Sequence, residues 1–122
     1  MRKRLLSLLL LSICGSMLFA QEPLDIDDVE QVPLGDFTYQ WRNIYDRTPL
    51  HGKCRIILSY RSYTIAHFNK DGILDGLYEK YEDNHLVQKL TYVKGILRGK
   101  GYEYYTDGTV KKECVWNEQG KI

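Results

Sequence analysis

Apolar and polar side chains alternate over short segments of this chain, and glycine, asparagine or aspartate stands between the segments. Phe37, Tyr39 and Trp41 alternate with polar residues, which is the period of two expected of a half-buried strand. Further strands are expected at 53–60, 63–68, 77–83, 86–92, 100–106 and 109–116. β-Branched and aromatic residues dominate these segments, and glycines recur too often for a long helical face. The pattern predicts an all-β fold.

The last six of these strands are expected to pair as three hairpins. Their turns are predicted at Arg61-Ser62, Asn84-His85 and Asp107-Gly108. Asp-Gly is a strong signal for a two-residue type I′ turn, because that turn needs a positive φ at both positions. A single hairpin is only marginally stable in water, so each hairpin is expected to depend on its neighbours.

The hairpins follow an internal repeat of 23 or 24 residues. Its aromatic openers are Tyr45, Phe68, Tyr92 and Trp116, and the glycines that end each connection are Gly52, Gly76 and Gly99. The sequence ends shortly after the fourth opener, so the strand at 109–116 is expected to be an exposed edge. Lys111, Lys112 and Glu113 are charges of the kind that discourage unspecific pairing at such an edge.

The clearest copy of the repeat resembles a known family. Residues 92–101 read YVKGILRGKG, an aromatic opener followed by Lys-Gly and a Gly-x-Gly step, which is similar to a MORN repeat. Residues 99–108 add Gly-x-x-x-x-Tyr-Tyr-x-Asp-Gly, which resembles the bacterial MORN-variant repeat of YwqK-type antitoxins. The resemblance covers residues 45–122 and departs from the pattern at Pro49, Arg61-Ser62 and His85. It implies a single-layer antiparallel meander of about three hairpin repeats, and it implies no reaction.

The chain is expected to have three parts, beginning with a secretory signal peptide at residues 1–20. Three basic residues precede an apolar stretch that is shorter than the roughly 20 residues of a membrane-spanning helix, and the stretch ends on Ala20. This predicts an exported protein, periplasmic or secreted. The alternatives are an uncleaved anchor and a lipoprotein attached through Cys14, although Ile13 is larger than a lipobox wants before its cysteine.

Residues 21–36 are expected to be an acidic linker, and residues 37–122 the repeat domain. Five acidic residues crowd the stretch around Pro23 and Pro33. A Ca²⁺ loop is the alternative, but the turn glycine and terminal glutamate of a known loop are missing. An extended, poorly ordered spacer is therefore predicted.

Charge argues against nucleic-acid binding. The full chain has 17 Lys+Arg and 16 Asp+Glu, a net charge of +1. Without the three basic residues of the leader, 14 basic and 16 acidic residues remain, a net charge of −2. A surface that binds phosphate backbones needs a basic surplus, so neither nucleic acid nor an anionic membrane surface is an expected partner.

Cys54 and Cys114 are not expected to bond to each other. In a simple meander they lie five strands apart, or about 24 Å, whereas a disulfide needs Cα atoms within about 7 Å. An intermolecular bridge stays open as an alternative. His51 and Cys54 have the spacing of half a zinc site, but no second pair follows, so no metal, cofactor or catalytic residue is predicted.

Tyrosines supply the candidate binding surface, because rows of tyrosines are common where proteins bind one another. The residues predicted to contact a partner are Tyr78, Tyr81, Tyr102, Tyr104, Tyr105 and Trp116. Structural packing is the competing role for the same side chains. The leading functional hypothesis is a non-catalytic scaffold that binds an unknown protein through a sheet face or edge. Two alternatives remain: an antitoxin or immunity protein that neutralises a toxin, and a membrane-surface protein.

Overall fold

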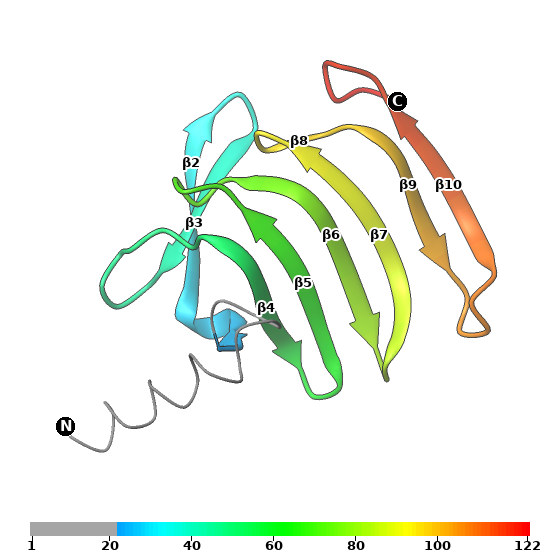
Figure 1. Cartoon of the computed structure of the whole chain (residues 1–122), viewed down its shortest axis with the longest axis horizontal. Helices are drawn as coiled ribbons and strands as arrows, with labels where there is room; N and C mark the ends of the chain where they lie inside the picture. The colour runs from blue at the N-terminus through cyan, green and yellow to red at the C-terminus, as the bar shows by residue number, and fades with distance from the viewer. Residues whose placement is uncertain (1–21) are drawn as a thin grey trace, which may run out of the picture.

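A computed structural model describes residues 22–122 as an all-β fold (Figure 1). The predicted signal peptide and Cys14 lie outside these residues. The elements are β1 (Leu24–Asp25), the 3-10 turn η1 (Ile26–Asp28), β2 (Val29–Gly35), β3 (Thr38–Asn43), β4 (Gly52–Ser59), β5 (Ser62–Phe68), β6 (Leu74–Glu82), β7 (His85–Val93), β8 (Ile96–Leu97), β9 (Gly99–Tyr104) and β10 (Val110–Trp116). Each predicted strand is present, and β6 begins three residues earlier than expected.

The strands form two sheets. Strands of the larger sheet follow the order β1-β4-β5-β6-β7-β9-β10, and β8 pairs with β7 (Figure 1). This sheet is mixed, because β1 runs parallel to β4 while its other pairs are antiparallel. The hairpin β2–β3 is a separate two-stranded sheet, so the described chain is not a single layer.

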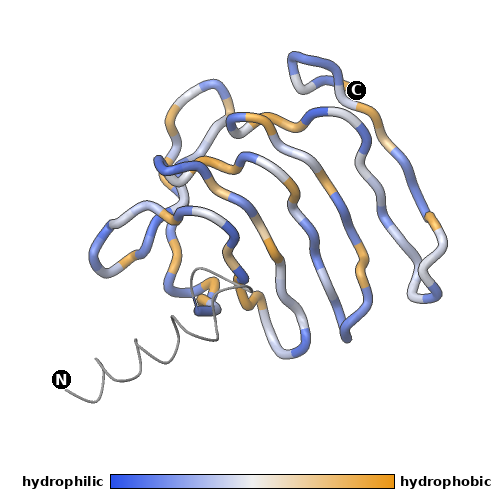
Figure 2. The backbone as a smooth tube through the Cα atoms, in the orientation of Figure 1, coloured by the Kyte–Doolittle hydropathy of each residue, from blue (hydrophilic) through white to orange (hydrophobic). Residues whose placement is uncertain are grey.

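The hairpin turns lie close to the predicted positions but differ in detail. Asp83 and Asn84 form the β6–β7 turn, with φ values of 51° and 64°. Tyr60 and Arg61 form the β4–β5 turn, since Ser59 pairs with Ser62. Both turns are thus one residue earlier than the sequence suggested. Figure 2 shows the β6–β7 turn as hydrophilic, as expected of a turn in water.

The Asp107-Gly108 turn is larger than the predicted two-residue type I′ turn. It belongs to the loop at 105–109, and the loops at 69–73 and 117–121 have the same pair of backbone hydrogen bonds. In each loop the first residue donates its N–H to the carbonyl of the fifth, and the fourth residue, a glycine, donates to the carbonyl of the first. Only the glycine has a positive φ, 91° at Gly108. The Asp107 carboxylate stabilises the loop by accepting from the N–H and hydroxyl of Thr109.

The core lies on one face of the larger sheet, which we call the covered face. This face carries Cys54, Ile56, Thr64, Ala66 and Phe68, each at most 4 % exposed. Trp41 of β3 and Leu50 close over it, and the rings of Trp41 and Phe68 lie 5.5 Å apart. Burying these apolar side chains is the main stabilising contribution to the fold. The core therefore sits at the β4–β6 end of the sheet, beneath the β2–β3 hairpin.

The acidic segment is part of this fold rather than a spacer. Leu24, Ile26 and Val29 pack against the core cluster, and β2 pairs with β3 along its length. The Glu30 carboxylate accepts a hydrogen bond from Nε of Arg42 at 2.6 Å. The prediction of an extended, poorly ordered linker is wrong for residues 24–35, because three apolar side chains fix the segment to the sheet.

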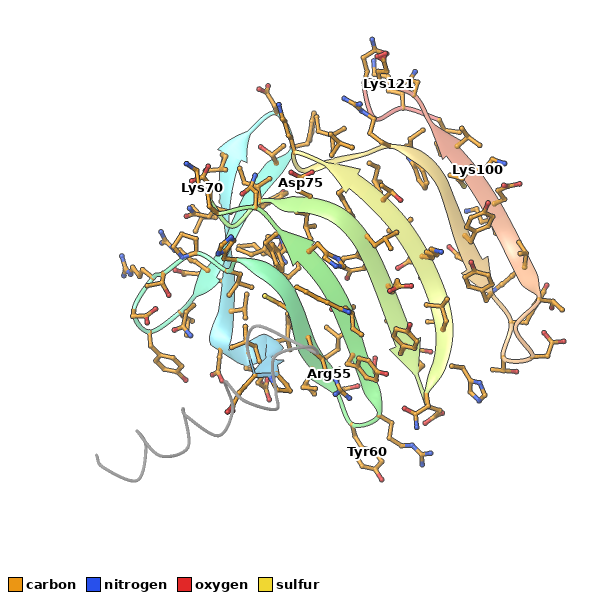
Figure 3. All side chains as sticks on the ribbon, viewed as in Figure 1. Arg55, Tyr60, Lys70, Asp75, Lys100 and Lys121 are labelled. Carbon is orange, nitrogen blue, oxygen red and sulfur yellow. The ribbon has the colours of Figure 1, made fainter. Side chains whose placement is uncertain are left out.

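The connections at the upper end of the sheet in Figure 1 pack closely against neighbouring segments. A Cβ atom at Gly72 would lie 2.5 Å from the carbonyl oxygen of Trp41. The backbone of Gly95 approaches the Thr38 side chain, and that of Gly120 approaches Ile96. The loops that carry Lys70 and Lys121 lie at this same end (Figure 3).

Candidate interaction surface

The six predicted contact residues do not share one surface. Tyr78 lies on the covered face, because it pairs with Ala66 and Leu90. Trp116 lies on that face too, two residues beyond Cys114, which pairs with Gly101. Tyr81, Tyr102 and Tyr104 lie on the opposite face of the sheet, and Tyr105 begins the β9–β10 loop. Because side chains alternate between the two faces of a strand, the observed register divides the predicted residues between both faces of the sheet.

Tyr78 belongs to the packing of the core. Its ring meets that of Tyr92 edge-on, with centroids 5.9 Å apart. Burial raises the pKa of both phenols above the ordinary value of 10.0, and a hydrogen bond with Thr64 partly opposes the shift at Tyr78. Tyr78 is half-buried and contacts other parts of the same chain.

The opposite face carries a short stack of side chains near the β4–β5 turn. Tyr63 and Tyr81 pair across β5 and β6, and their rings stack with centroids 5.1 Å apart. The Arg55 guanidinium lies over the Tyr63 ring at 4.4 Å, a cation–π contact. Figure 3 shows Arg55 near the same lower end of the sheet as Tyr60. The side chains of Arg55, Tyr63 and Tyr81 thus cover the opposite face near the β4–β5 turn.

A second aromatic pair lies on β9. The rings of Tyr102 and Tyr104 stack with centroids 6.0 Å apart, on the same face as Tyr81. Tyr105 begins the β9–β10 loop, where its side chain is 53 % exposed and Lys111 Nζ lies 5.9 Å from the ring centroid. The aromatic residues of β9 are thus separated from Trp116 by the sheet itself.

Strand β10 is the edge of the sheet in the described part of the chain. It pairs with β9 alone, so one row of its backbone groups has no strand beside it. Its residues are exposed except for Cys114 and Trp116, which are half-buried. A register shift between Val110 and Lys112 leaves Lys111 as an extra residue. Such a bulge and adjacent lysines are features that proteins use to limit unspecific strand pairing.

An apolar cleft lies beside this edge on the covered face. It has a volume of about 230 Å³, and Leu90, Leu97, Cys114, Trp116 and Ile122 supply its apolar lining. The Trp116 ring lies over Gly101, where a Cβ atom would meet ring carbon Cζ3 at 2.5 Å. Of the six predicted contact residues, Trp116 and Tyr102 border this cleft, and the sequence did not indicate the other lining residues. Leu90 could have been found because alternation puts it on the same face as its partner Tyr78, whereas Leu97 comes from the short strand β8 and Ile122 from the segment beyond β10.

A wider cleft of about 420 Å³ separates the β2–β3 hairpin from β7 and β8. Its aromatic lining comes from Phe37, Tyr39, Trp41 and Tyr92, and Gln31 and Asp36 supply polar groups. Phe37 is 95 % exposed at the tip of the hairpin. No pattern along the chain indicates this cleft, because the segments around it are far apart in the sequence.

The cysteines lie five strands apart, on β4 and β10, as expected from the strand order. Cys54 is fully buried, and its thiol lies 3.6 Å from the carbonyl oxygen of His51. Burial raises the pKa of the Cys54 thiol, and that hydrogen bond partly opposes the shift. Within residues 22–122, no group of three His, Cys, Asp or Glu residues is placed to hold a metal ion. The His-x-x-Cys spacing thus accompanies a buried core thiol.

Alkaline pH is expected to destabilise the fold through the buried tyrosines. Because the folded pKa of Tyr92 is raised above 10.0, the unfolded chain ionises first. The stabilising contribution is fully present below about pH 10 and is lost as the pH rises through the higher folded value. Tyr92→Phe should make the loss of unfolding free energy above pH 10 shallower. Denaturant titrations at several pH values would show this, and Tyr60→Phe, at a side chain 89 % exposed, should leave the slope unchanged.

Helices long and apolar enough to cross a membrane are absent from residues 22–122. No protein-family model and no curated protein matches the chain. Among solved structures, it is similar to TarM with a TM-score of 0.40 and 15 % identity, over 76 % of this chain and 18 % of that one. A mutant of S. aureus TarM in complex with Fondaparinux, alpha-GlcNAc-glycerol and UDP gives a TM-score of 0.30 and 13 % identity, over 77 % and 16 %. The chain spans less than a fifth of either structure, and likeness at this level assigns it neither a family nor an activity.

Proposed function

We propose that this chain is an exported, non-catalytic scaffold of the MORN-variant kind, which binds another protein along β10. The observation that carries the proposal is the unpaired edge of β10 beside the apolar cleft at Trp116. Unpaired backbone groups bind an incoming strand by main-chain hydrogen bonds, and a neighbouring pocket selects its side chains.

The repeated loops support the repeat part of the proposal. Asn69 and Asn117 each follow an aromatic opener, and each accepts two backbone N–H groups within its own loop. The two loops have the same backbone hydrogen bonds and lie 48 residues apart, which is twice the repeat period. The same local structure thus recurs after two aromatic openers that lie two repeat periods apart.

The shifted pKa values support a structural role for the groups that carry them. Burial is the main cause of the raised pKa of Cys54, Tyr78, Tyr81 and Tyr92. Local hydrogen bonds explain the others: Tyr45 donates to Asp28, Asp46 accepts from Thr48, and Asp107 accepts from Thr109. These shifts arise from packing and from hydrogen bonds to neighbouring side chains and backbone groups, which are structural causes.

Site-specific photo-crosslinking in the native envelope would test the proposal. A benzophenone side chain at Val115, an exposed position of β10, should crosslink to one discrete protein. The same group at Tyr60, which is exposed at the β4–β5 turn, is the matched control and should not capture that protein. Capture of a toxin domain at Val115 would favour the immunity alternative. Equal capture at both positions, or none at either, would contradict binding along β10.

A further inference from the structure

We propose that the cleft between the β2–β3 hairpin and β7–β8, which we call the hairpin cleft, binds a small quaternary ammonium compound. Such a compound carries a positive nitrogen surrounded by methyl or other alkyl groups. The hairpin cleft has a volume of about 420 Å³, and its lining includes no residue of β10. The inference therefore goes beyond the proposed function and does not depend on it.

Aromatic rings line both walls of the hairpin cleft. Tyr39 and Trp41 lie on one face of β3, because they are two residues apart, and Tyr92 of β7 supplies a ring from the larger sheet. The rings of Trp41 and Tyr92 are held by packing against other rings of the chain. Phe37 and Tyr39 are 95 % and 44 % exposed, so much of their aromatic surface remains open to a ligand.

The hairpin tip presents Phe37 in an unfavourable backbone conformation. Gly35 pairs with Thr38, so Asp36 and Phe37 form a two-residue turn, with φ values of 52° and 64°. Glycine is favoured at the second position of such a turn, and a bulky side chain is rare there. Burial of the ring does not offset this cost, because Phe37 is almost fully exposed. Backbone strain of this kind is typical of ligand-binding positions.

The charge of the lining favours a cation. Among the described residues that line the hairpin cleft, Asp36 alone is charged, and Gln31 and Gln119 are neutral. Lys94 and Lys121 are next to lining residues in the sequence but do not line the cleft themselves. The cleft thus offers an anion no ionic partner, whereas the faces of its aromatic rings and its carboxylate both attract a cation.

The cation that fits is organic rather than a metal ion. Calcium takes six to eight oxygen ligands, and one carboxylate with two amide side chains supplies too few. Within residues 22–122, no three His, Cys, Asp or Glu side chains are grouped to hold a metal. Aromatic rings instead bind alkylated ammonium groups through their faces.

The walls of the hairpin cleft are already fixed in position. The Trp41 N–H donates to the Gly72 carbonyl at 2.7 Å, and the Gly95 N–H donates to the Leu74 carbonyl at 2.7 Å. A Cβ atom at Gly95 would lie 2.9 Å from a methyl carbon of Thr38, so the hairpin and the β7–β8 turn are in close contact. Figure 1 shows the hairpin tip beside β8. Binding therefore requires little ordering of the protein.

Titration of choline into the whole protein, followed by amide NMR, would test the inference. Shifts are expected at 35–41 and 92–97 and not along β10. Ethanolamine has hydrogens in place of the methyl groups, and the carbon isostere of choline has a tert-butyl group in place of the cation. Each should bind about tenfold more weakly than choline. Equal binding of the carbon isostere, or binding of a neutral saccharide such as maltose in place of choline, would overturn the inference.

Variants of the hairpin tip test the same site. Phe37→Gly should weaken choline binding by about tenfold, because it removes an aromatic face. It should also raise the midpoint of thermal unfolding, because glycine adopts a positive φ freely. Asp36→Asn should weaken binding by a similar factor while keeping a favourable turn residue.

Two control variants change the same chemistry at the other end of the sheet. Tyr60→Gly removes a ring that is 89 % exposed, and Asp83→Asn removes a carboxylate at a turn residue with a φ of 51°. Both should leave the affinity for choline unchanged. Equal affinities in Phe37→Gly and Tyr60→Gly, or a lower unfolding midpoint in Phe37→Gly with unchanged choline binding, would overturn the inference. Photo-crosslinking at Val115 reports on the scaffold alone, so the two proposals fail separately.

Discussion

Phe68→Ala is expected to lower the free energy of unfolding by about 3–5 kcal/mol. Phe68 is 4 % exposed and lies at the centre of the core, where its ring packs against Trp41. The substitution removes the apolar area that the ring buries and leaves a cavity that the paired strands cannot easily fill. Since small domains have a total stability of about 5–15 kcal/mol, this one change would remove a large part of it.

Denaturant unfolding followed by tryptophan fluorescence would measure the effect, because Trp41 contacts the site of the change. The matched control is Tyr60→Ala, which removes another aromatic ring at a position 89 % exposed. It should change the stability by less than about 0.5 kcal/mol. Similar losses in both variants would mean that Phe68 is not at the centre of the core.

Gly72→Ala is expected to destabilise the fold by about 3 kcal/mol, from two separate causes. Gly72 has a φ of 78°, a left-handed conformation that costs an alanine about 1–2 kcal/mol. The new Cβ atom would also lie 2.5 Å from the Trp41 carbonyl oxygen, so the backbone must move. That movement strains the 2.7 Å hydrogen bond from the Trp41 N–H to the Gly72 carbonyl, which joins β3 to the connection.

Gly108→Ala separates these two causes. Gly108 occupies the same position of an equivalent loop, with a φ of 91°, and a Cβ atom added there would have no neighbouring atom within 4 Å. Its replacement should therefore cost only the left-handed conformation, about 1 kcal/mol. Thermal or denaturant unfolding of both variants gives the difference. Equal losses would show that the contact with Trp41 contributes nothing.

Alternation of side chains made the strands predictable, because it follows directly from burial on one face of a sheet. The turns were harder to place, since register depends on contacts between strands. Asn84-His85 and Asp83-Asn84 both supply polar residues, and the pairing of Glu82 with His85 decides between them. At Asp107, the dipeptide signal for a type I′ turn was overridden by the backbone bond from Tyr105 to Thr109.

Composition gave a wrong prediction for the acidic segment, because contacts with other segments determine its structure. Five acidic residues between Glu22 and Glu30 made the segment at 21–36 resemble a solvated spacer. Only three apolar side chains, Leu24, Ile26 and Val29, fix it to the core, and the surfaces that they cover lie on β4 and its neighbours. Leu24 and Ile26 alternate with Asp25 and Asp27, which was the available signal, but the surface that the apolar side chains cover is set by the fold.

The candidate site was predicted in part. Trp116 and the strand at 109–116 were identified, and both lie at the edge now proposed to bind a partner. The tyrosines were grouped by composition, although Tyr78 and Tyr81 are three residues apart and therefore point to opposite faces. Leu97 of β8 and Ile122, beyond β10, complete the cleft, and only the folded chain brings them together.

The loops at the two ends of the sheet differ in how easily they could be lengthened. At the upper end, the backbones at Gly72, Gly95 and Gly120 lie against side chains or carbonyls of neighbouring segments, so an inserted residue there would displace several strands at once. At the lower end, Gly108 has no neighbour within 4 Å of its missing side chain, and the Arg61–Asp83 ion pair is largely exposed. A residue inserted at the β9–β10 turn would thus alter the surface alone, whereas one inserted beside Gly72, Gly95 or Gly120 would disturb the packing between segments.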